Sequence, residues 1–71
     1  MIKYDPLWVT MKNKNITKYY LKTYCEINNN TLHKLKYNQP LNTTTIERLC
    51  EILDCNVQDI MTYEKNPKNN K

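Results

Sequence analysis

The chain has 71 residues, a formal net charge of +4, 25% charged residues, three cysteines and no glycine. A chain this short forms one domain around one small core, and its positive charge makes a polyanionic partner plausible. The absence of glycine excludes glycine-rich nucleotide-binding loops, and no catalytic set of residues is recognisable, so we do not expect an enzyme.

The charge is distributed unevenly along the chain. Residues 1–40 contain seven lysines against Asp5 and Glu26, whereas residues 41–64 contain Arg48 against five acidic residues. This segregation predicts one basic face, and an ordinary solvated surface is the alternative interpretation. Residues 65–71 add three lysines and contain no apolar side chain, so we expect a folded domain over residues 1–64 and a disordered basic tail over 65–71.

Targeting signals and metal motifs are not recognisable. Apolar runs are only a few residues long, so we expect no membrane span and a cytoplasmic location. Cys25, Cys50 and Cys55 are odd in number and lack a C-x-x-C spacing, and His33 is the single histidine. We therefore expect no zinc site, and interpret the cysteines as small half-buried thiols. No cofactor and no small-molecule ligand is expected.

A pattern that recurs five times predicts where helices begin. An apolar or aromatic residue precedes a capping residue, and a second apolar residue follows the cap by four positions. The cap side chain accepts a hydrogen bond from a first-turn amide, and the two apolar residues pack across it. The copies are Tyr4-Asp5…Val9, Ile16-Thr17…Leu21, Ile27-Asn28…Leu32, Leu41-Asn42…Ile46 and Cys55-Asn56…Ile60.

Five starts predict an all-α domain of five short helices. The first follows Asp5, with Pro6 at its first position, and Trp8 and Tyr24 are expected in the core. We also expect a short two-stranded pairing of the termini, residues 2–4 with 62–64. The remaining helices are expected at about residues 18–24, 29–36, 43–54 and 57–61.

Residues 16–37 carry the strongest indication of function. Their apolar residues recur every three to five positions, which suits two short helices joined by a tight turn at Cys25-Glu26. The face left exposed after burial is rich in amide and cationic groups. Its residues are Asn28, Asn29, Asn30, His33, Lys34 and Tyr37. A helix-turn-helix protein presents such a face to the major groove of DNA.

The whole pattern resembles the Cro/CI-type (Xre) helix-turn-helix transcriptional regulators of bacteria and phages, and most closely their small stand-alone members. The resemblance is carried by Tyr4-Asp-Pro-Leu-Trp8, by Leu53-Asp-Cys-Asn-Val-Gln-Asp-Ile60, and by Leu21, Ile27, Thr31-Leu32 and Leu35 between them. It implies a five-helix, phage-repressor-like fold over about residues 2–64. The chain departs from the family at Glu26, where the turn usually has glycine, and at Lys22, where many members have a small residue.

The resemblance also implies a function. We expect sequence-specific binding of double-stranded DNA by a transcriptional regulator that acts as a repressor, binds as a homodimer and reads the major groove with the helix at about 29–36. Family base contacts correspond to Asn28, Asn29, Asn30 and Lys34, and phosphate contacts to Lys18, Tyr37, Asn38, Thr43 and Thr44. Asn28 has a second interpretation as a helix cap.

A protein-interaction module, such as a small antitoxin or inhibitor with the same fold, is the alternative function. The acidic stretch 47–59 would serve it. The polar, cationic face of residues 28–37 favours DNA instead. For the dimer interface we expect the fifth helix and Met61-Thr-Tyr63, together with residues 1–4, because apolar residues there exceed what so small a domain buries.

Overall fold

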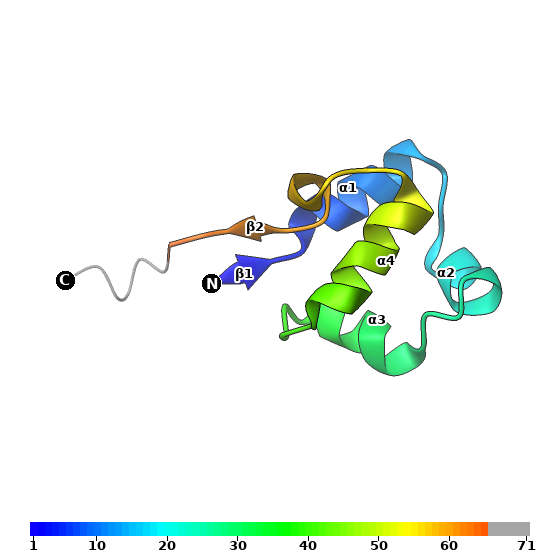
Figure 1. The fold of residues 1–71 in the computed structure, drawn as a ribbon, viewed down its shortest axis with the longest axis horizontal. Coiled ribbons are helices and arrows are strands. Elements are labelled where there is room, and N and C mark those ends of the chain that lie inside the picture. The colour runs from blue at the N-terminus through cyan, green and yellow to red at the C-terminus, as the bar shows by residue number, and fades with distance from the viewer. Residues whose placement is uncertain (66–71) are drawn as a thin grey trace.

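Four α-helices surround one apolar core in the computed structural model, which describes residues 1–65 (Figure 1). The predicted tail therefore lies outside the described residues, except for Lys65. The elements in chain order are β1 (Ile2–Lys3), α1 (Asp5–Asn13), α2 (Lys18–Tyr24), α3 (Asn29–Lys36), α4 (Thr43–Leu53), the 3₁₀ turn η1 (Val57–Asp59) and β2 (Thr62–Tyr63). No helix in residues 1–65 has the length and apolarity that crossing a membrane requires.

The predicted fifth α-helix is wrong, because Val57–Asp59 forms only a single 3₁₀ turn. Its start was placed correctly, since the Asn56 amide donates to Oδ2 of Asp59 at 3.1 Å. The helix does not continue because Thr62–Tyr63 is already extended and pairs antiparallel with Ile2–Lys3. A short connection between a cap and a strand leaves room for the tighter 3₁₀ turn and no more.

The terminal ribbon formed by β1 and β2 confirms the predicted pairing of the two ends. Ile2 lies opposite Tyr63 and Lys3 opposite Thr62. An ion pair between Lys3 and Glu64, at 3.0 Å, also joins β1 to the residue that follows β2. Figure 1 shows this ribbon projecting away from the helices.

Three predicted caps are present as side-chain hydrogen bonds. Thr17 accepts from the Tyr20 amide at 3.0 Å. Asn28 accepts from the Thr31 amide at 2.8 Å, and Asn42 from the Thr45 amide at 2.9 Å. These bonds satisfy first-turn amides that no backbone carbonyl reaches, and so fix the starts of α2, α3 and α4.

The first predicted cap is wrong. Asp5 lies within α1, whose N-cap is Tyr4 without a side-chain cap bond, and Val9 is exposed and cannot pack across the start. A long-range anchor sets this helix instead. Asn38 Oδ1 accepts from the Tyr4 amide at 3.0 Å, and the buried Tyr4 hydroxyl donates to the Gln39 carbonyl at 2.8 Å.

Each α-helix is followed within two residues by a residue in the left-handed region. These residues are Asn15, Glu26, Asn38 and Asp54, with φ of 57°, 58°, 56° and 51°. Asn and Asp tolerate this conformation better than other residues with a Cβ, so they replace the glycine that the chain lacks. Glu26 has no such advantage.

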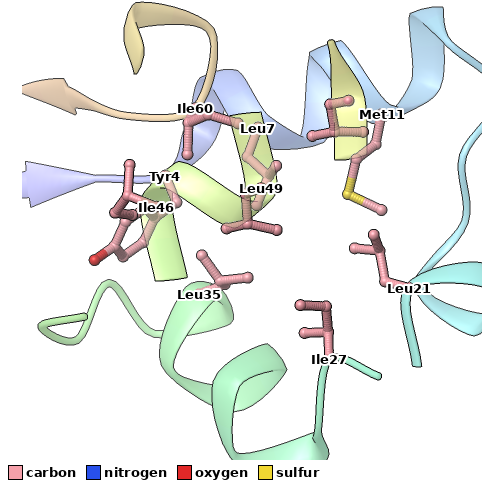
Figure 2. Close-up of a cluster of buried hydrophobic side chains, with 10 residues drawn as sticks. Tyr4, Leu7, Met11, Leu21, Ile27, Leu35, Ile46, Leu49 and Ile60 are labelled. Carbon is pink, nitrogen blue, oxygen red and sulfur yellow. The ribbon is translucent and has the colours of Figure 1, made fainter. Parts of the chain in front are cut away.

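The centre of the core is built from fully buried leucines of all four α-helices and from Ile60, which directly follows η1. Figure 2 shows Leu35 of α3 directed toward Leu49 of α4, with Leu21 and Ile27 beside them. Trp8 packs partly buried against this cluster. Tyr24 does not, because its side chain is 69% exposed, and the prediction of a core role was wrong. Ile27 is buried just beyond the turn, and the Tyr24 ring lies against Tyr20 at 5.4 Å between centroids.

Candidate nucleic-acid interface

The turn between α2 and α3 has the predicted position. Cys25 and Glu26 form it, with Glu26 at φ 58°, and the Ile27 amide donates back to the Leu21 carbonyl at 3.0 Å. Arg48 of α4 donates from Nη2 to the Cys25 carbonyl at 2.5 Å. The turn is thus held from within and by a side chain of another helix.

One side of α3 is inserted in the core and the opposite side faces solvent. Leu35 is fully buried and Leu32 partly buried, which fixes the rotation of α3 about its axis. Asn29, Asn30 and His33 are exposed as a result. Side chains three or four residues apart lie on one face of a helix, so these three form a continuous polar surface.

Lys34 continues this surface one turn after Asn30. Lys34 is only partly exposed, and a lysine in this situation can keep its stem against the protein while its ammonium group reaches solvent. His33 stacks on Tyr37 with 4.6 Å between ring centroids, and Lys36 Nζ lies 5.5 Å from the Tyr37 centroid. The C-terminal half of α3 therefore carries a cationic and aromatic cluster.

Asn28 is engaged as a cap, because its Oδ1 accepts from the Thr31 amide. A base contact from Asn28 would have to use its remaining NH₂ group. Asn38 is likewise engaged through Oδ1, which accepts from the Tyr4 amide. Both side chains keep donor hydrogens and have lost much of their acceptor capacity.

The remaining candidates for phosphate contact lie on the elements that flank α3. Lys18, in the first turn of α2, has its Nζ 5.0 Å from the Trp8 ring centroid, which holds the ammonium group near the start of α2. Tyr37 is exposed at the end of α3. Thr43 and Thr44 are exposed in the first turn of α4, where amide groups also point outward.

Two features were missed by the sequence reasoning. Arg48 was counted only as a charge, because nothing local indicates a bond to a carbonyl 23 residues away. The tyrosines of α2 form an exposed aromatic surface: Tyr19 and Tyr24 are each 69% exposed, and Tyr20 lies between them. The sequence does indicate that the adjacent Tyr19 and Tyr20 cannot both be buried, but the exposure of all three tyrosines was not predicted.

Comparison with known proteins decides the family. A family model described as the Cro/C1-type HTH DNA-binding domain matches residues 6–66. The chain belongs to this family. The resemblance seen in the sequence is therefore confirmed, and the α2–turn–α3 unit is the helix-turn-helix of a Cro/C1-type domain.

Among solved structures, the chain is similar to one titled "Crystal structure of transcriptional regulator VanUg, Form II". The two share 25% identity with a TM-score of 0.83, and the match covers 92% of this chain and 87% of that one. No curated protein matches the chain. The Cro/C1-type fold of this chain is thus shared over nearly its whole length with a solved transcriptional regulator.

Proposed function

We propose that this Cro/C1-type protein is a transcriptional regulator that binds double-stranded DNA sequence-specifically and reads the major groove with α3. The observation that carries the proposal is the solvent-facing side of α3, where Asn29 and Asn30 are exposed and Lys34 is partly exposed while Leu35 anchors the helix to the core. The structural likeness to a transcriptional regulator supports it.

Base reading is assigned to the N-terminal end of α3, including its cap, and to the next turn of the same helix, which carries Lys34. Asn29 and Asn30 have free amide groups, which can pair bidentately with adenine. Lys34 supplies an ammonium donor for the O6 and N7 acceptors of guanine. Asn28 contributes through its NH₂ group, because its Oδ1 is engaged in the cap.

Phosphate contacts would fix the position of α3 in the groove without reading sequence. Lys18 is suited to contact a phosphate of one DNA strand, because its ammonium group is held over Trp8 at the start of α2. Tyr37, Asn38, Thr43 and Thr44 offer hydroxyl and amide donors at the other end of α3 and the start of α4. Repression by blocking access to the bound site is the simplest mode of action for such a domain.

We further propose that the protein binds as a homodimer on a near-palindromic site. A single α3 touches few base pairs, and two copies about one helical turn apart roughly double the contacts. We place the dimer interface on the terminal ribbon and η1, because apolar side chains are exposed there. Tyr63 is 71% exposed, Met1 52% and Val57 49%.

Selection from a random duplex pool, followed by fluorescence anisotropy on the enriched site, tests the proposal. We expect one enriched motif with dyad symmetry, and binding that weakens steeply with added salt because lysines displace counterions. Sedimentation with and without the duplex gives the number of chains bound. Absence of any enriched motif would contradict sequence-specific binding, and one chain on a site without symmetry would contradict the dimer alone.

A protein partner is the second candidate function, favoured by the exposed tyrosines of α2. Tyrosine is enriched at protein interfaces because its ring is apolar and its hydroxyl forms hydrogen bonds. Replacing Tyr19 and Tyr24 by serine separates the two functions. Loss of a partner with DNA affinity retained would assign the α2 surface to protein binding.

A further inference from the structure

The end of α4 brings two cysteines together. Asp54 is in the left-handed region at φ 51°, the Cys55 amide donates to the Cys50 carbonyl at 3.0 Å, and the Asp54 amide donates to the Glu51 carbonyl at 3.4 Å. This is the Schellman arrangement of a helix end, in which the side chains at the positions of Cys50 and Cys55 meet. The side chains of Cys50 and Cys55, which are five residues apart in the sequence, are therefore neighbours.

The two thiols are free, half-buried and close enough to influence each other. Burial raises the pKa of the Cys55 thiol, and the neighbouring Cys50 raises it further. Both residues also line a cavity of ≈ 380 Å³ between α4 and η1, together with Met61. Two cysteines and one methionine therefore line a single cavity that opens to solvent.

We propose that Cys50, Cys55 and Met61 form a binding site for a soft, thiophilic metal ion of the Cu(I) class. Thiolate and thioether ligands select such an ion over harder ones. Zinc is a poor match, because a structural zinc site takes four Cys, His or carboxylate ligands, and residues 1–65 contain no group of three such side chains that could hold a metal. The proposed ligands are few and all contain sulfur, and the cavity wall beside them is partly apolar because it includes Ile46 and Val57. Such a set of ligands favours a soft ion.

The binding step requires no oxidant or reductant. Each thiol loses its proton to solvent as its sulfur bonds to the ion, Met61 contributes a sulfur lone pair, and the ion keeps its oxidation state. The competing explanation is that the cysteines are only the apolar contact of a helix end. That explanation predicts no metal affinity, and it requires nothing of Met61.

Titration of the reduced, oxygen-free protein with Cu(I), in competition with a chromophoric Cu(I) chelator, distinguishes the two. We expect one ion per chain and sulfur scatterers around it in X-ray absorption. Cys50→Ser and Cys55→Ser should each abolish this binding, and Met61→Leu should weaken it because one sulfur ligand is lost. Cys25→Ser is the matched control and should bind as the wild type does, because Cys25 is absent from the cavity wall.

The proposal is overturned if the wild type competes for no Cu(I), if Cys25→Ser removes binding as completely as Cys50→Ser, or if X-ray absorption finds no sulfur ligands. Circular dichroism identifies a variant that fails to fold. In that case the test rests on the X-ray absorption spectrum of the wild type and on the Cu(I) affinity of Met61→Leu, because leucine keeps the side-chain volume and removes the sulfur. None of these measurements involves DNA, so their outcome is independent of the proposed regulatory function.

Discussion

Arg48 Nη2 donates a hydrogen bond of 2.5 Å to the carbonyl of Cys25, which joins α4 to the turn between α2 and α3. The orientation of α3 relative to α2 depends on this turn. An exposed arginine on an otherwise acidic stretch of the chain thereby helps to position α3, the proposed recognition helix. This bond would hold α3 at a defined angle to α2.

Arg48→Ala should lower the free energy of unfolding by about 1 kcal/mol, a typical net value for a hydrogen bond with an exposed partner. Urea denaturation followed by circular dichroism measures this change. Lys12→Ala removes one exposed positive charge from α1 and serves as the control, with an expected change of less than about 0.5 kcal/mol. Equal stabilities for the two variants would show that the bond to Cys25 contributes nothing.

Glu26→Gly should raise stability by about 0.5–1 kcal/mol, because the left-handed backbone at φ 58° costs a residue with a Cβ more than it costs glycine. Glu51→Gly, in the interior of α4, should lower stability by about 1 kcal/mol. Thermal unfolding of both variants measures the difference. A loss of stability in Glu26→Gly similar to that in Glu51→Gly would mean that the turn is not strained.

Asn28 has two assigned roles that substitutions can separate. Asn28→Ala removes the bond to the Thr31 amide and should destabilise the protein by about 1 kcal/mol, whereas Asn28→Ser keeps a cap and should restore most of that loss. Both variants lack the amide NH₂ group. If Asn28→Ser also restores DNA affinity measured by anisotropy, the residue acts as a cap alone.

Tyr4 should make stability fall at alkaline pH. Burial raises its pKa above the ordinary value of 10.0, so the folded protein holds the phenolic proton more tightly than the unfolded chain does. This contribution is complete below the unfolded pKa and is lost as pH rises through the folded pKa. Urea titrations across about pH 8–11 should therefore show a steeper decline in the wild type than in Tyr4→Phe.

At neutral pH, Tyr4→Phe should cost about 1 kcal/mol, because the hydroxyl no longer donates to the Gln39 carbonyl. Tyr63→Phe, at an exposed tyrosine, is the matched control and should leave neutral stability unchanged. Parallel pH profiles for wild type and Tyr4→Phe would show that Tyr4 does not contribute to the loss of stability at alkaline pH.

Local signals in the sequence were enough to predict most of the fold. Side-chain caps at Thr17, Asn28 and Asn42 act within three residues, so the starts of α2, α3 and α4 were predictable. Long-range contacts were not. The start of α1 depends on Asn38, 34 residues away in the chain, and the length of η1 depends on the pairing of Thr62 with Lys3.

The candidate interface was predictable to a similar extent. Burial of Leu35 fixes which side of α3 is exposed, and this follows from apolar spacing alone. The engagement of Asn38 Oδ1 and the bond from Arg48 to the turn depend on residues brought together only by folding. The exposure of Tyr24 was misjudged because apolar spacing cannot show that Ile27, beyond the turn, is buried in its place.

Binding of Lys34→Ala to a duplex selected by the wild type tests the central claim most directly. Lys34 is partly exposed on α3, one turn after Asn30, and Figure 1 shows α1, which carries the control residue Lys12, on the other side of α4 from α3. Anisotropy should show that Lys34→Ala loses about 1–3 kcal/mol on the selected site, with Lys12→Ala close to wild type. Unchanged affinity of Lys34→Ala for that site would contradict the assignment of α3 as the reading helix.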